Sequence, residues 1–274
     1  MSRLFDRHRS KRHRSKWHRP KCQALAAAIA LSVLAAACGG GNTSAPATTA
    51  APGPPPIPID PATAATVTGK ISFAGTAPAP QPIKMSSDPN CAQSGAPATA
   101  ETLIVGGGGE LQNVFVYVKD GLGNRTFAVP TAAATLDQRG CQYTPHVIGV
   151  QVGQPLEIVN SDSTLHNVHA VPKQNGEFNT GQPLKGMKHA HTFSTKEVMV
   201  PFKCDVHGWM NAYAGVLDHP FFAVSGADGS FEIKGMPPGS YTIEAWHERL
   251  PTMTQKVTIG AKENRQVAIS FKVG

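Results

Sequence analysis

The chain has 274 residues, of which 41% are hydrophobic and 16% are charged. This hydrophobic fraction is enough for a packed core, so a wholly disordered protein is excluded. The length corresponds to about two domains. No apolar run reaches the ~20 residues that a membrane-spanning helix needs, so a polytopic membrane protein is excluded as well.

The net charge of +7 is distributed unevenly along the chain. Of the 25 Lys and Arg and the 18 Asp and Glu, residues 1–37 contain nine basic residues and one acid. The remaining 16 basic and 17 acidic side chains give residues 38–274 a net charge of −1. Nucleic-acid binding needs a basic surface on the folded part, so no nucleic-acid partner is expected.

Residues 1–37 have the layout of a secretory signal peptide, with a basic stretch, an apolar run from Ala24 to Ala37 and small residues at its end. The segment 34–38 (LAAAC) resembles a bacterial lipoprotein signal, which implies lipidation of Cys38. The same residues also fit ordinary Ala-x-Ala cleavage. We therefore expect an exported protein, periplasmic or at the outer cell surface, with a lipid anchor at Cys38 as its membrane contact.

Residues 38–64 are rich in Ala, Thr and Pro and predict an extended linker. From residue 65 onward, short alternating or β-branched runs are separated by turn residues, and no segment keeps a 3.6-residue period. This spacing predicts an all-β protein built from β-sandwiches, with a long loop over 84–109. The expected strands are 66–73, 111–118, 147–152, 155–159, 198–203, 212–217, 229–233, 240–246, 254–259 and 266–273.

Residues 204–210 contain a cysteine, a histidine and a methionine in the pattern C-x2-H-x2-M, at the end of an expected strand. A further histidine, His166 or His169, would come from a neighbouring strand. Two His, one Cys and a weakly bound axial Met form the ligand set of a type 1 copper site. Soft sulfur suits Cu(I) and imidazole suits both oxidation states, so an electron can move with little rearrangement.

The two upstream histidines are three residues apart, so they point to opposite faces of a strand. His166 shares its face with Val168 and Ala170, whereas His169 shares its face with Asn167 and Val171. The more apolar neighbours favour His166 as the inward ligand.

Residues 131–218 resemble a cupredoxin, and the sequence HNVH at 166–169 with the short loop at 204–210 resembles the amicyanin type. The resemblance implies a Greek-key β-sandwich that holds one type 1 copper ion. The implied ligands are His166, Cys204, His207 and Met210. It also implies that Asn167 fastens the two ligand segments by hydrogen bonds. His207 would lie at the surface, as the route for electrons to a redox partner protein.

Once Cys204 is assigned to the metal, Cys91 and Cys141 remain as candidates for a disulfide in an oxidising compartment. Cys22 would leave with the signal peptide, and Cys38 is the lipidation candidate. A bridge between Cys91 and Cys141 would tie the loop 84–109 to the copper domain.

Residues 227–242 contain the turns ADGSF and GMPPGSYT, which resemble the second half of a carboxypeptidase-regulatory-like (transthyretin-like) sandwich. The runs VTGKI and VFVYV, at 67–71 and 114–118, fit the first half of that family. We therefore expect a second, smaller sandwich that is split by the copper domain, with three pieces packed in sequence as the alternative. The expected parts are 65–130 and 219–274 for this sandwich and 131–218 for the copper domain.

The sequence thus predicts an exported mononuclear type 1 copper protein that carries single electrons between redox partner proteins. It is not expected to be an enzyme, because neither G-x-S-x-G nor H-E-x-x-H nor a pair of catalytic carboxylates is present. Two alternatives stay open: a metal-free structural or binding protein at the cell surface, and a periplasmic copper carrier.

Overall fold

The structure, a computed structural model, describes residues 55–93 and 98–272. All of these residues belong to one compact unit within Ala51–Gly274. The predicted signal peptide and the lipidation candidate Cys38 lie outside the described residues. In the part of the chain that the structure describes, no helix is long and apolar enough to cross a membrane.

Strands dominate the described residues, where the one helix is α1 (Pro89–Ala92). The strands are β1 (Ala65–Ala74), β2 (Phe115–Asp120), β3 (Ala134–Arg139), β4 (Gln142–Thr144), β5 (Val147–Gln151), β6 (Pro155–Asn160), β7 (His166–Ala170), β8 (Phe178–Gln182), β9 (Lys188–Thr192), β10 (Glu197–Lys203), β11 (Asn211–Leu217), β12 (Phe222–Val224), β13 (Ser230–Met236), β14 (Gly239–His247), β15 (Leu250–Ile259) and β16 (Asn264–Lys272). The predicted all-β fold class is confirmed.

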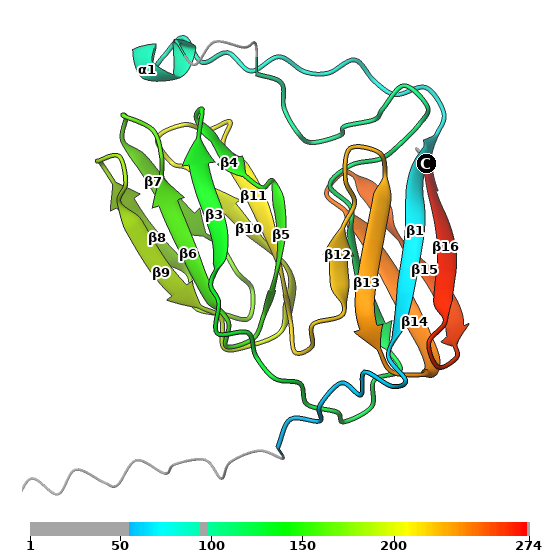
Figure 1. Cartoon of the computed structure of the whole chain (residues 1–274). Coiled ribbons are helices and arrows are strands. Elements are labelled where there is room, and N and C mark those ends of the chain that lie inside the picture. The colour runs from blue at the N-terminus through cyan, green and yellow to red at the C-terminus, as the bar shows by residue number, and fades with distance from the viewer. Residues whose placement is uncertain (1–54, 94–97, 273–274) are drawn as a thin grey trace, which may run out of the picture. The chain divides into compact units, whose positions relative to one another are not determined.

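Four sheets form two sandwiches (Figure 1). The larger sandwich consists of the sheets β5-β11-β10-β7-β8 and β4-β3-β6-β9, which share one hydrophobic core. The smaller sandwich consists of the sheets β13-β1-β16 and β12-β2-β14-β15, which share a second hydrophobic core. Along β6, buried and half-buried residues alternate, as expected for a strand with one face on a core.

The smaller sandwich is built from both ends of the described chain. Strand β1 pairs with β13 and β16, and β2 pairs with β12 and β14. The strands β3 to β11 lie between them in sequence and pair among themselves. The domain boundaries at 130/131 and 218/219 and the transthyretin-like resemblance stay predictions.

The ten expected strands all correspond to observed ones, with shifts of a few residues at their ends. Among the strands without a predicted counterpart are β8 and β9, which lie at sheet edges. Their residues are half-buried or exposed at most positions. These two edge strands are polar along most of their length, so they lack the apolar or β-branched run by which the expected strands were recognised.

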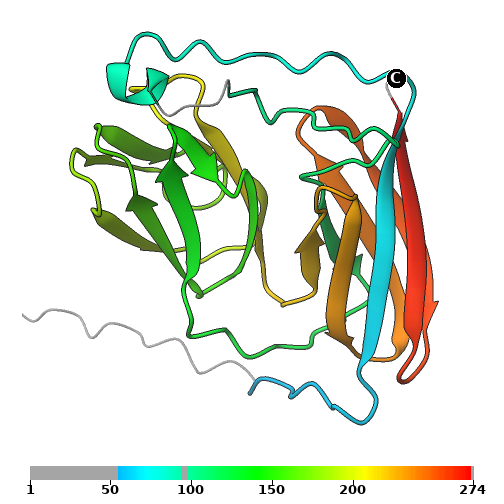
Figure 2. The ribbon, with the colours of Figure 1, turned by 45° about the horizontal axis from the view of Figure 1, so that its top comes forward.

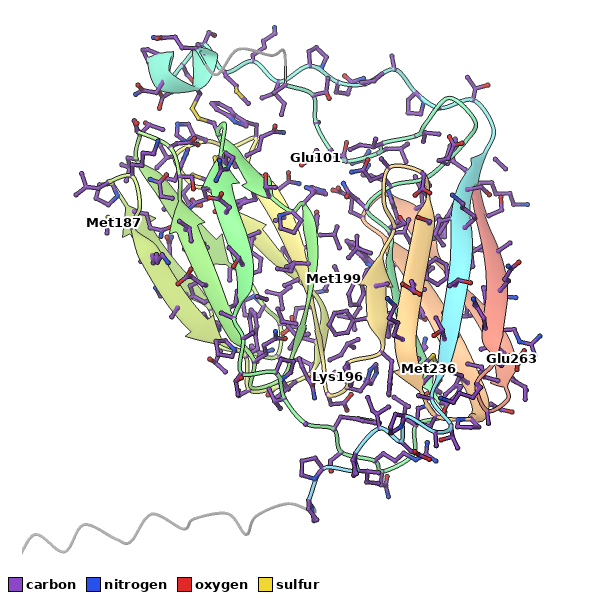
Figure 3. All side chains as sticks on the ribbon, viewed as in Figure 1. Glu101, Met187, Lys196, Met199, Met236 and Glu263 are labelled. Carbon is purple, nitrogen blue, oxygen red and sulfur yellow. A yellow bond between two sulfur atoms is a disulfide. The ribbon has the colours of Figure 1, made fainter. Side chains whose placement is uncertain are left out.

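Two glycines on the larger sandwich make room for aromatic rings. Gly149 on β5 and Gly215 on β11 are paired in register. A Cβ atom at position 215 would lie 2.2 Å from the Phe115 ring, and one at position 149 would lie 2.2 Å from the Phe222 ring. Phe115 is fully buried in a separate hydrophobic cluster that includes Met199, which is labelled in Figure 3.

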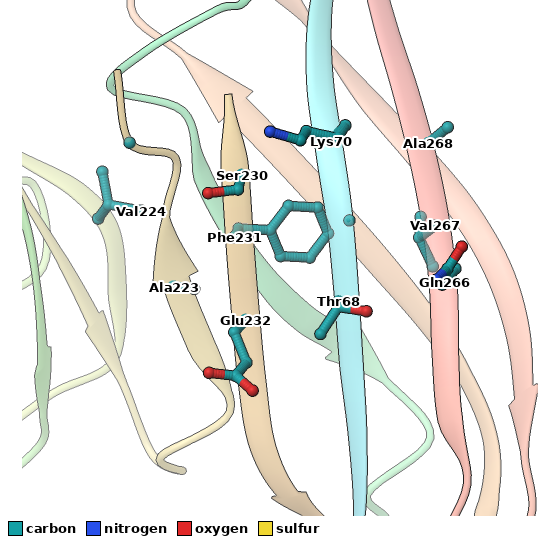
Figure 4. A pocket seen from close by; sticks show the side chains of 12 residues that line it. Thr68, Lys70, Ala223, Val224, Ser230, Phe231, Glu232, Gln266, Val267 and Ala268 are labelled. Carbon is teal, nitrogen blue, oxygen red and sulfur yellow. The ribbon is translucent and has the colours of Figure 1, made fainter. Parts of the chain in front are cut away.

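The smaller sandwich carries an open hollow of about 800 Å³ along β1, β12 and β13 (Figure 4). Lys70, Phe231 and Glu232 are among the residues that line it. None of the predicted copper ligands lines this hollow, so it is separate from the candidate metal centre.

Candidate metal centre

Strand pairing brings the two predicted ligand segments together. His166 begins β7 and Cys204 directly follows β10, and these strands are antiparallel, with Lys203 opposite His169. The loop after β10 is closed by its own backbone: Cys204 N donates to Met210 O at 3.1 Å, and Met210 N donates to His207 O at 2.9 Å. His166, Cys204, His207 and Met210 are all buried, each with at most 2% of its surface exposed.

Three of the predicted ligands form a compact cluster. One donor atom each from His166, Cys204 and His207 lie within 4.8 Å of one another. His166 Nδ1 is 2.9 Å from His207 Nδ1, and Cys204 Sγ is 3.9 Å from His207 Nδ1. Met210 lies in the same buried cluster of side chains as Cys204. Cys204 is a free cysteine, so its sulfur is available to a metal.

The donor set fits a copper ion. The Nε2 atom of each histidine faces a carboxylate, which favours the tautomer that carries its proton on Nε2. The two Nδ1 atoms lie 2.9 Å apart on the side of Cys204, so both could offer their lone pairs to an ion once it replaces the proton between them. Two imidazoles and a thiolate, with a thioether as a weak fourth donor, are the ligands that copper takes in sites that transfer electrons.

Asp162 holds His166 in place. Its carboxylate lies 2.9 Å from His166 Nε2 and accepts from the backbone N–H groups of Gly140 and Cys141, both at 2.8 Å. Burial of Asp162 favours its neutral form, but the hydrogen bonds from His166 and the two backbone N–H groups outweigh this and lower its pKa. Asp162 therefore stays ionised and links His166 to the turn between β3 and β4.

The surroundings of Cys204 favour its thiolate form. Burial disfavours the thiolate, but hydrogen bonds from His166 and from the backbone N–H of His207 outweigh it and lower the pKa of Cys204. The thiolate is the form of cysteine that binds metals.

Asn167 lies between the two segments that carry the predicted ligands. Its Oδ1 accepts from the backbone N–H of Asp205 at 2.6 Å, and its Nδ2 donates to Asn179 Oδ1 at 2.7 Å. The buried Tyr143 adds a second link, because its hydroxyl lies 2.7 Å from Asn167 O and 3.1 Å from Lys203 O. The function of Asn167 toward a metal stays a prediction.

His169 does not join the cluster. Its Nδ1 lies 2.8 Å from Asp205 Oδ2 and its Nε2 lies 2.8 Å from Glu177 Oε1. The structure therefore brings His166, rather than His169, to Cys204, in agreement with the alternation of side chains along a strand.

The expectation that His207 lies at the surface is wrong, because only 2% of this residue is exposed. Its Nε2 is 3.0 Å from Asp88 Oδ2 and 3.7 Å from Cys91 Sγ. Both residues come from the long loop that contains α1, which lies over the end of the larger sandwich (Figures 1 and 2). An insertion between β1 and β2 thus covers the histidine.

The predicted disulfide between Cys91 and Cys141 is confirmed, with its two Cα atoms 5.6 Å apart; it is drawn as a yellow bond next to α1 in Figure 3. It attaches the long loop to the turn between β3 and β4. Trp209 packs beside it: the indole N–H donates to Cys141 O at 2.9 Å, and the ring centroid is 5.0 Å from that of His207.

Sequence reasoning missed Asp88, Asp162, Tyr143 and Trp209. Asp88 precedes Pro89 and has the pattern of a helix N-cap, three residues before Cys91. With the disulfide assumed, this pattern would have placed a carboxylate near the metal centre. No comparable signal marks the other three residues, because their contacts depend on the folded chain.

No protein-family model and no curated protein matches the chain. Among solved structures, the purple cupredoxin from Nitrosopumilus maritimus is 22% identical with a TM-score of 0.26; the match covers 30% of this chain and 98% of the cupredoxin. A reduced mutant of amicyanin is 24% identical with a TM-score of 0.28; the match covers 37% of this chain and 97% of amicyanin. The copper-containing nitrite reductase (NirK) from Thermus scotoductus SA-01 is 20% identical with a TM-score of 0.31 and covers 36% of this chain. This chain spans only 26% of that enzyme.

Proposed function

We propose that the chain is an exported electron carrier that holds one copper ion in a type 1 site. The proposed ligands are His166, Cys204, His207 and Met210. The observation that carries this proposal is the convergence of two imidazole Nδ1 atoms and one thiol sulfur at the buried end of a β-sandwich. Copper bound there would supply a one-electron couple between Cu(II) and Cu(I).

The residues of the chain hold the donors in fixed positions. Asp162 orients His166, and Asn167 and Tyr143 fasten β7 to the segment that carries Cys204. Since both ligand segments are tied by hydrogen bonds, the donors need to move little when the charge of the ion changes. The burial of all four proposed ligands keeps water away from the thiolate.

Electron transfer fits the site better than catalysis on a substrate. Four protein ligands would leave no open position on the ion, whereas catalytic metal sites keep one. The cavity beside Met210 and Trp209 has a volume of about 10 Å³, which is room for about one water molecule. The same burial argues against a copper carrier, because handing copper to another protein needs accessible ligands.

The test is to add one equivalent of Cu(II) to the metal-free protein and record visible and electron paramagnetic resonance spectra. We expect an intense thiolate-to-copper absorption and a narrow copper hyperfine splitting. Replacing Cys204 with Ala is expected to remove the absorption. A colourless protein whose Cys204 still reacts freely with thiol reagents would support the metal-free alternative. Binding of Cu(I) alone, with rapid loss to chelators, would support the carrier.

A further inference from the structure

We infer that the segment from Asp88 to Cys91 is a cap on the proposed metal centre, in which Asp88 is a positioning residue for His207; the inference rests on the proposed function. This segment belongs to the connection between β1 and β2, far from the ligand loop in sequence. It closes the side of His207 that points away from His166 and Cys204.

The carboxylate of Asp88 is held at both oxygens. Its Oδ1 accepts from the backbone N–H of Asn90 at 2.8 Å, where Asp88 caps the start of α1. Its Oδ2 accepts from the Thr164 hydroxyl at 2.7 Å and lies 3.0 Å from His207 Nε2. Thr164 comes just before the proposed ligand His166, so the cap is tied directly to the other ligand segment.

The disulfide fastens the cap to the larger sandwich. Cys91, 1% exposed, is bridged to Cys141, whose backbone N–H donates to the Asp162 carboxylate that holds His166. Met85, just before the cap, is buried in the core of the larger sandwich. The cap is therefore docked by a covalent bond, an apolar contact and two hydrogen bonds.

This arrangement has two consequences for a copper ion. A carboxylate that accepts from Nε2–H turns the Nδ1 lone pair of His207 toward the centre and makes the imidazole a stronger donor. The added negative charge also favours Cu(II) over Cu(I), which lowers the reduction potential. In addition, the buried imidazole is closed to direct contact with a redox partner, so electrons must enter through a neighbouring part of the surface.

The experiment compares two matched variants, Asp88→Asn and Asp60→Asn. Asn keeps the size of the side chain and removes its charge. Asp60 is a suitable control, because it also accepts from a backbone N–H two residues on (Ala62, 2.8 Å) and from a threonine hydroxyl (Thr63, 3.1 Å), but it does not contact the metal centre. We expect Asp88→Asn to raise the reduction potential and Asp60→Asn to leave it unchanged.

A second readout needs no metal. In the metal-free protein, Asp88→Asn is expected to loosen the cap, because the charge that holds Thr164 and His207 is lost, and so to give reagents access to the buried His207. Its reaction with diethyl pyrocarbonate, mapped by mass spectrometry, is therefore expected to be several-fold faster than in the wild type. If Asp88→Asn does not fold, Thr164→Val removes one of the hydrogen bonds that dock the cap and keeps the charge of Asp88. It is expected to speed the reaction of His207 without raising the reduction potential, and an unchanged reaction rate would overturn the cap.

The outcomes separate this inference from the proposed function. A wild-type protein that shows no thiolate-to-copper absorption contradicts the proposed function. Copper binding with the same potential and the same His207 reactivity in wild type and Asp88→Asn overturns the cap while leaving the electron carrier in place. Loss of copper from Asp88→Asn but not from Asp60→Asn supports the cap.

Discussion

Removing the disulfide between Cys91 and Cys141 is expected to lower the free energy of unfolding by about 4 kcal/mol. The two residues are 50 positions apart in sequence. A cross-link that closes a loop of this length restricts the unfolded chain, and the loop-entropy relation gives about 4 kcal/mol at 25 °C. Both cysteines are buried, so Ala is the appropriate replacement, because Ser would bury two hydroxyl groups.

The size of the effect depends on how the two sandwiches unfold. The loop closed by the disulfide includes β2, which belongs to the smaller sandwich, and β3, which belongs to the larger one. The full 4 kcal/mol appears only if both sandwiches unfold in the same transition. If the larger sandwich unfolds alone, β2 stays in the folded smaller sandwich and already restricts part of the loop. Removing the disulfide then costs less than 4 kcal/mol, and the protein unfolds in two transitions.

The assay is guanidinium unfolding of the metal-free protein, followed by circular dichroism and tryptophan fluorescence. It compares the wild type, the wild type reduced by a phosphine, and the double variant Cys91→Ala/Cys141→Ala. Cys204→Ala is the control for loss of a buried sulfur without loss of a cross-link. A single transition with less than about 1 kcal/mol lost in both the reduced protein and the double variant would refute the loop-entropy reasoning.

Three further predictions concern single residues. Met210→Leu is expected to retain copper and to raise the reduction potential, because a donor that favours Cu(II) is lost; unchanged voltammetry would argue against axial ligation. His169→Ala is expected to keep the thiolate-to-copper absorption, and bleaching would show that His169 rather than His166 is the ligand. Burial lowers the pKa of His219 to about 4, so the unfolded chain takes up a proton at a higher pH than the folded one. Its contribution to stability is therefore complete above about pH 6.5 and falls by about 3 kcal/mol as the pH drops to 4. Thermal unfolding of the wild type and His219→Gln across this range checks the effect, which should be absent from the variant.

The features that sequence could predict are local ones. Most of the strands are short alternating or β-branched runs, and their turns carry Gly and Pro, so both could be located in the sequence. The C-x2-H-x2-M loop spans seven residues, so its members had to lie close together in any fold. The alternation of side chains along β7 was enough to prefer His166 over His169.

The cover on His207 could not be predicted in the same way. Asp88 is 119 positions from His207 in sequence. The two residues meet only because the connection between β1 and β2 extends across to the larger sandwich. The resemblance to cupredoxins led to the opposite expectation, because it covers the ligand loop and not the inserted segment. A local motif fixes which atoms can bind a metal, but distant segments decide whether they are exposed.

The connection between β1 and β2 also links the two sandwiches physically. Both strands belong to the smaller sandwich, yet their connection supplies the carboxylate beside His207 and one half of the disulfide in the larger one. Residues 131–218 contain all four proposed ligands, but lack Asp88 and Cys91. The smaller sandwich holds both ends of the segment that we propose as the cap, so we expect changes in this sandwich to alter how the proposed copper site exchanges electrons.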